Sequence, residues 1–86
     1  MKNLEQCLKD IDRRMTIYKL YKMLDGSITQ ASLYAINRDP EINIRLSTAS
    51  LIFDVTKNKL GRGLRPWDYL MNVQDWSKYE KTFGSK

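Results

Sequence analysis

Histidine is absent from the 86-residue sequence, and cysteine occurs once, at position 7. Without an imidazole the chain cannot form a Cys/His zinc site or a histidine-based catalytic triad. A single thiol also excludes a disulfide within one chain. We therefore expect no metal site and no cofactor, with Cys7 packed as a small apolar side chain.

Long apolar runs are also missing. No stretch reaches the roughly 18 to 20 apolar residues that a membrane-spanning helix needs. The segment Met1-Lys2-Asn3-Leu4-Glu5 lacks the apolar core of a signal peptide. We therefore expect a cytoplasmic protein that does not bind membranes and whose cysteine is reduced.

The length and the charge indicate the kind of partner. A chain of 86 residues forms one domain. A domain of this size buries only about 60% of its unfolded surface, so a second subunit is a plausible source of stability. Lysine and arginine number 15 against 10 acidic residues, a net charge of +5 that favours polyanionic partners.

Apolar residues recur every third or fourth position, which predicts helices and not strands. The first helix is expected over about 3–24 and ends at Asp25-Gly26, because glycine tolerates the left-handed conformation of a helix C-cap. A second helix over about 28–38 is capped by Ser27 or Thr29.

Asp39-Pro40-Glu41 predicts the start of a third helix over about 40–59, because proline is favoured at the first helical position. This helix is apolar over much of its circumference, so we expect it to be central and buried. A last helix is expected over about 67–79, and residues 84–86 should fray. The predicted fold is a small, single-domain, all-α bundle of three main helices plus a short C-terminal helix, orthogonal or up-down.

A helix-turn-helix is the first candidate functional feature. Thr16–Leu24 would be the supporting helix, residues 25–27 the turn, and Thr29–Tyr34 the start of the reading helix. Gln30, Ser32 and Tyr34 would contact base edges or phosphates, and Arg38 would contact the nucleic-acid backbone.

Lys22 and Met23 depart from that motif, which normally has a small residue before the turn so that the helices pack closely. A plain helical hairpin with solvated polar side chains therefore remains open as an alternative.

The second candidate is a run of cations without an intervening acid, formed by Lys57, Lys59, Arg62 and Arg65. Gly61 and Gly63 would let a phosphate approach the backbone closely. Cations are also favoured at a helix C-terminus whatever the function, so a solvated helix end is the alternative interpretation.

The third candidate is an aromatic C-terminal segment that contains Trp67, Tyr69, Trp76 and Tyr79. Aromatic side chains bury large areas, so this segment could fold back to complete the core. If it stays exposed, it forms an apolar patch of the kind that binds a protein partner.

Catalysis is not expected. Asp10 and Asp12 are two apart, so on a helix their carboxylates point in different directions. Helix capping accounts for the other acidic pair, Asp39 and Glu41. We find no pairing of a nucleophile with a base, and we expect a protein that is not an enzyme.

Residues 26–61 resemble the helical hairpin of bacteriophage small-terminase-type proteins, in which an acidic-Pro break precedes a helix of the form R-x-x-x-A-x-x-[IL]-[IL]-D. The matching positions are Asp39-Pro40, Arg45, Ala49, Ile52, Asp54 and Lys59-Leu60-Gly61. The pattern also resembles single units of HEAT-like repeats. The resemblance implies a phage or prophage accessory protein, located in the bacterial host cell, that oligomerises and recognises DNA, with a role in DNA packaging or regulation.

Two hypotheses follow. In the first, the chain binds nucleic acid, with DNA favoured over RNA. The residues expected to carry this binding are Lys57, Lys59, Arg62, Arg65, Gln30, Tyr34 and Arg38. In the second, the chain is an interaction module or inhibitor that binds a host or phage protein through its aromatic segment.

Overall fold

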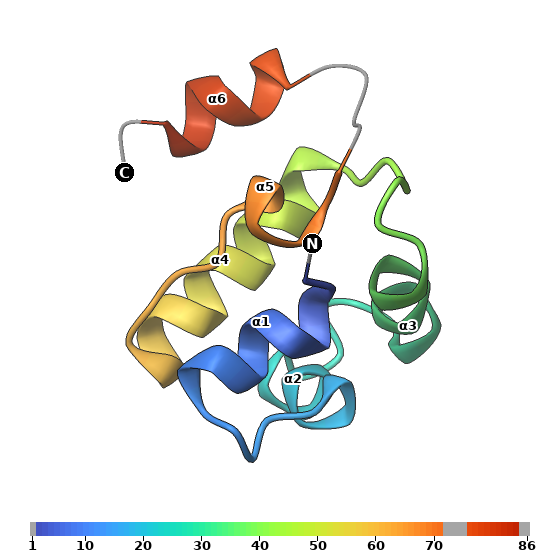
Figure 1. Cartoon of the computed structure of the whole chain (residues 1–86), viewed down its shortest axis with the longest axis vertical. Coiled ribbons are helices and arrows are strands. Elements are labelled where there is room, and N and C mark those ends of the chain that lie inside the picture. The colour runs from blue at the N-terminus through green and yellow to red at the C-terminus, as the bar shows by residue number, and fades with distance from the viewer. Residues whose placement is uncertain (1, 72–75, 85–86) are drawn as a thin grey trace.

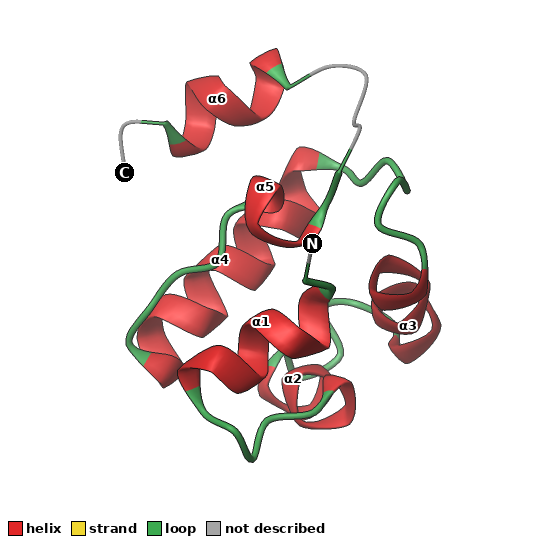
Figure 2. Cartoon of the chain, in the orientation of Figure 1, coloured by secondary structure: helices red, strands yellow, loops and turns green. Residues whose placement is uncertain are grey.

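The computed structural model describes residues 2–71 and 76–84, and these ranges contain six helices and no strand (Figure 2). The predicted small all-α bundle is confirmed. The helices are α1 (Leu4–Ile11), α2 (Ile17–Met23), α3 (Gln30–Arg38), α4 (Leu46–Leu60), α5 (Pro66–Tyr69) and α6 (Ser77–Phe83). None of these described helices is long and apolar enough to cross a membrane.

The sequence predicted one helix over 3–24. This prediction is wrong because the segment forms two helices, α1 and α2. Asp12 is extended, and its Oδ1 accepts a hydrogen bond from the Arg14 amide at 3.0 Å. Thr16 Oγ1 accepts one from the Lys19 amide at 3.1 Å and caps α2. These polar side chains compete for backbone amides that a continuous helix would have used.

The predicted third helix over 40–59 starts later, at Leu46. Asp39 Oδ1 accepts a hydrogen bond from the Glu41 amide at 3.1 Å, which closes a local turn and does not cap a helix. Ile44 is buried between the exposed residues Asn43 and Arg45, as the alternation of an extended segment requires. At its other end α4 stops at Gly61 with a φ of 84°, where the sequence predicted a stop.

The predicted last helix over 67–79 corresponds to two helices, α5 and α6, and its residues 72–75 lie outside the described residues. The Met71 amide donates a hydrogen bond to the Pro40 carbonyl at 2.7 Å and joins the chain after α5 to the turn before α4. Of the residues expected to fray, only Gly84 is described, and its amide donates to the Glu80 carbonyl.

Every helix contributes to a single apolar core, in which α2 packs on α3 and α1 packs on both α3 and α5. The largest fully buried side chains come from the C-terminal part of the chain: Tyr69, Tyr79 and Phe83, all 0% exposed. Figure 1 shows α3 on one side of the molecule and the C-terminal end of α4 on the other. The polar residues of α3 and the basic residues at the end of α4, which were predicted to form one nucleic-acid-binding site, therefore lie apart in the fold.

Candidate nucleic-acid interface

Helix α3 forms because its start is capped and one face is apolar. Thr29 Oγ1 accepts a hydrogen bond from the Ser32 amide at 3.1 Å, which satisfies a donor that the helix leaves unpaired. Leu33 and Ile36 lie on the inner face and are 0% and 2% exposed. Their burial fixes which face of α3 points to solvent.

The outer face of α3 carries a polar stripe, defined here as Gln30, Tyr34 and Arg38. The three residues are exposed and spaced four apart, so they lie along one side of the helix. Over eight residues the stripe is roughly 12 Å long. No acidic residue occurs within α3. The structure therefore brings together these three residues of the predicted site.

Helix α1 holds α2 and α3 in place through two hydrogen bonds at Glu5. The Glu5 amide donates to Asn37 Oδ1, on α3, at 2.8 Å. The Glu5 carboxylate accepts from the Ile17 amide, at the start of α2, at 3.0 Å. The carboxylate also suits the positive end of the α2 dipole. Both bonds join residues far apart in the sequence, and no pattern in the sequence indicated Glu5 or Asn37.

The connection between α2 and α3 spans residues 24–29 and includes two left-handed residues, Asp25 with φ 52° and Gly26 with φ 82°. It is longer than the three- or four-residue turn of an ordinary helix-turn-helix. Met23 lies beside Leu51 and Val55 of α4, so its bulk does not separate α2 from α3. The missing small residue therefore does not prevent the two helices from packing.

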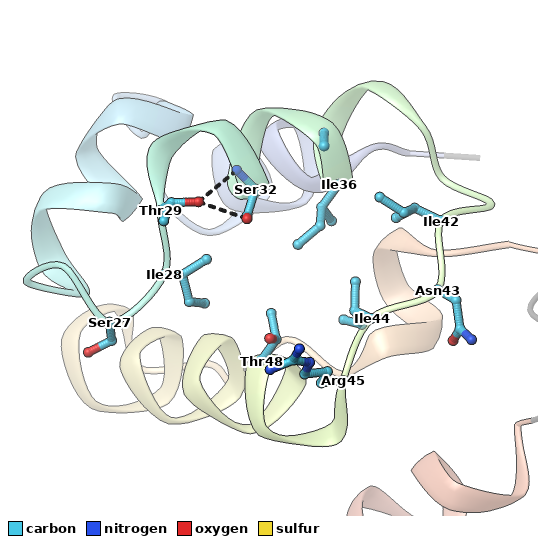
Figure 3. Close-up of a pocket in the computed structure, with 11 residues that line it drawn as sticks. Ser27, Ile28, Thr29, Ser32, Ile36, Ile42, Asn43, Ile44, Arg45 and Thr48 are labelled. Carbon is cyan, nitrogen blue, oxygen red and sulfur yellow. Dashed lines mark hydrogen bonds between the residues drawn. The ribbon is translucent and has the colours of Figure 1, made fainter.

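A groove of about 460 Å³ runs beside α3, between this helix and the extended segment that leads into α4 (Figure 3). Ile28, Ile36 and Ile44 form apolar walls, as Figure 3 shows. Arg45 is the one charged residue among those that line the groove, and it has no acidic partner within salt-bridge distance among the described residues.

The basic run at the end of α4 is divided between two places. Lys57, Arg62 and Arg65 line one pocket, whereas Lys59 lines another, next to α2. Residues two apart on a helix point in nearly opposite directions, which explains why Lys57 and Lys59 separate. Arg65 is half-buried, and its Nε donates to the Phe83 carbonyl at 3.1 Å. The C-terminal end of α4 lies across the molecule from α3 (Figure 1).

Two of the four residues predicted for the aromatic surface lie in the core. Tyr69 and Tyr79 are 0% exposed, which corrects their assignment to a protein-binding surface, because a partner cannot reach them in this fold. Trp67 remains 37% exposed and packs edge-on against Phe83. Trp76 is half-buried against Tyr79. Only the two tryptophans remain available to a partner.

Within the described ranges, no group of three or more His, Cys, Asp or Glu side chains could hold a metal ion. Among the described residues, the polar stripe on α3 and the basic pocket at the end of α4 are the two candidate surfaces. No protein-family model, curated protein or solved structure matches this chain.

Proposed function

We propose that this chain is a non-enzymatic accessory protein of phage or prophage type that binds double-stranded DNA and inserts α3 into the major groove. The observation that supports this proposal most directly is the polar stripe on α3. The stripe is exposed on a helix whose opposite face is buried. A major groove about 12 Å wide accepts one α-helix, and a supporting helix behind it is the usual arrangement. Helix α2 packs on α3, and we assign it this supporting role.

Each stripe residue has chemistry suited to DNA. The Gln30 amide can donate and accept toward an adenine edge, as glutamine commonly does. The guanidinium of Arg38 can form paired hydrogen bonds with guanine or with a backbone phosphate. Tyr34, which is 39% exposed, offers a ring for apolar contact and a hydroxyl for a phosphate.

Cations on α2, the helix that packs on α3, support the same partner. Lys19 and Lys22 are exposed on α2, and Lys22 Nζ lies 5.9 Å from the centre of the Tyr18 ring. In helix-turn-helix proteins the supporting helix crosses the DNA backbone, where such cations neutralise phosphates. The resemblance of residues 26–61 to phage small-terminase-type proteins is a second argument for a DNA partner and for a role in packaging or regulation.

Fluorescence anisotropy with labelled duplexes tests the proposal. Duplexes selected from a random pool should bind the wild type, with an affinity that falls steeply as salt rises. Arg38→Ala should weaken binding by about tenfold and reduce the salt slope by about one unit. Gln30→Ala should weaken binding to the selected duplex more than to an unselected one.

Lys81→Ala is the matched control. Lys81 is exposed on α6, and its replacement removes the same single charge as Arg38→Ala. It should change the affinity by less than about twofold, because a distant charge is largely screened. Equal losses for the two variants would mean that net charge alone drives binding, and that α3 is not the interface.

Binding of a host or phage protein through the aromatic segment is less well supported. Half of the residues predicted for that surface lie in the core, and an interface needs a cluster of exposed anchors. Trp67→Ala tests this alternative, since it should leave DNA affinity unchanged under the present proposal.

A further inference from the structure

The pocket at the end of α4 has the composition of an anion site. It has a volume of about 260 Å³, and its cations are Lys57, Arg62 and Arg65. Asp68 is the one acidic residue among those that line it. The Asp68 carboxylate already accepts a hydrogen bond from the Arg65 amide at 2.8 Å.

The loop that carries this pocket is held rigidly. The Leu64 amide donates to Thr56 Oγ1 at 2.9 Å, and the Leu64 side chain is 1% exposed. At Gly63, a Cβ would lie 2.5 Å from Phe53 Cε2, so the ring excludes every larger residue unless it moves. The backbone of the loop is therefore anchored to α4, which reduces the entropy lost when a ligand binds.

The Phe53 ring positions two of the cations. Lys57 Nζ lies 5.8 Å and Arg65 Cζ lies 5.6 Å from the ring centre, within the range of cation–π attraction. Lys57 and Arg62 are exposed, and neither has a carboxylate within salt-bridge distance among the described residues. Their charges are thus available to a ligand.

Backbone donors are present at the same place. In the described part of the chain, the amides of Arg62 and Gly63 donate no hydrogen bond. The C-terminus of α4 contributes partial negative charge, which opposes an anion. The two exposed cations, Lys57 and Arg62, outweigh this partial charge and the single Asp68 carboxylate. The net field in the pocket therefore favours a phosphate.

The position of the pocket decides which phosphate it can reach. A duplex that receives α3 in its major groove lies along one side of the molecule, whereas the C-terminal end of α4, whose residues help to line the pocket, lies on the other side (Figure 1). We propose that this pocket binds a backbone phosphate of a second DNA segment, so that one chain joins two segments. This inference rests on the proposed function of α3.

A co-capture assay tests it. One duplex is fixed to beads, a second duplex carries a fluorophore, and the retained fluorescence is measured after the protein is added at low salt. Wild type should retain the second duplex. Arg62→Glu should reduce retention by about tenfold while weakening the anisotropy-measured affinity for one duplex far less than Arg38→Glu does. Arg38→Glu should reduce both quantities.

Lys59→Glu is the matched control, because it makes the same charge change at the same helix end but lies outside the pocket. The Lys59→Glu variant should retain much more of the second duplex than the Lys57→Glu variant does. Equal loss in the two variants would assign co-capture to net charge and would overturn the site.

The remaining outcomes separate the two proposals. Failure of wild type to bind any single duplex would overturn the role of α3. Normal single-duplex binding without co-capture would overturn only the bridging inference. Co-capture that survives both Arg62→Glu and Lys57→Glu would also overturn it, because bridging would then arise from pairing of two chains.

A further experiment distinguishes a phosphate of DNA from a phosphate of a free nucleotide. ATP is titrated into the Arg38→Glu variant and binding is measured by calorimetry. No binding at millimolar ATP, together with co-capture by wild type, supports a polymer ligand. ATP binding that Arg62→Glu abolishes, without co-capture by wild type, would assign the pocket to free phosphate compounds and would overturn the DNA assignment.

Discussion

The hydroxyl of Tyr79 donates a hydrogen bond to the Ile44 carbonyl at 2.6 Å, deep in the core, and so joins α6 to the extended segment before α4. Lys78 Nζ reaches the same carbonyl at 3.2 Å. Tyr69 is equally buried, but its hydroxyl has no hydrogen-bond partner among the described residues. Burial accordingly raises the pKa of Tyr69 well above its usual range.

Replacement by phenylalanine should lower the free energy of unfolding at Tyr79 but not at Tyr69. Tyr79→Phe should lower the free energy of unfolding by about 1 kcal/mol, because a buried hydrogen bond is lost. Tyr69→Phe should leave it unchanged or raise it by about 1 kcal/mol, because an unpaired hydroxyl no longer needs to be desolvated. Urea denaturation measures both.

Tyr18→Phe provides the reference, since Tyr18 is 49% exposed and the change should have almost no effect on stability. A loss of stability in Tyr69→Phe as large as that in Tyr79→Phe would show that the Tyr69 hydroxyl has a partner.

Thr56 is the one buried polar residue of the described core, and it holds the loop after α4. Thr56→Val keeps the shape of the side chain but leaves the Leu64 amide without an acceptor. We expect a loss of about 1 to 3 kcal/mol in the free energy of unfolding, the cost of an unsatisfied buried donor. Thr48→Val, at the rim of the groove beside α3, should cost less than about 0.5 kcal/mol. Equal costs would contradict the role assigned to the Thr56 hydroxyl.

Cys7 should react slowly with thiol reagents while the protein is folded. It is 6% exposed, and burial, followed by the nearby Asp68 carboxylate, raises its pKa above the ordinary thiol value. Alkylation at pH 8 should therefore be much faster in urea than in buffer. Similar rates in the two conditions would show that α1 opens readily.

The raised pKa of Cys7 also has a consequence for stability. Folding favours the protonated thiol, so this contribution is fully present below the ordinary thiol pKa and is lost as the pH rises through the raised value. A Cys7→Ala variant should lose less stability than wild type over that alkaline range.

Helix content and the end of α4 were predictable because they depend on local patterns: apolar spacing, and a glycine at the C-cap. The break after Ile11 was not, because Met15 continues the apolar period although the chain turns there. Likewise, Asp39-Pro40 has the composition of a helix start, but the alternation around Ile44 favours an extended strand-like segment. At both places the local sequence is compatible with either a helix or a break, and tertiary packing determines which one forms.

The candidate site was predictable only where it depends on a local sequence pattern. Gln30, Tyr34 and Arg38 share a face by helical spacing alone, so the structure brings them together as the sequence suggests. Whether the basic run joins them depends on where the end of α4 lies relative to α3. That placement is set by tertiary packing, which no short-range pattern encodes.

The bond between Tyr79 and Ile44 also bears on how the chain reaches this fold. It joins residues 35 apart in the sequence, so a long loop must close before it can form. Helices α2 and α3, which follow each other in the sequence and pack together, meet through contacts of shorter range, which are favoured early in folding. We therefore expect docking of α6 to be a late event. Weakening it should accelerate unfolding far more than it slows folding, so that the C-terminal helix determines how long the native state lasts.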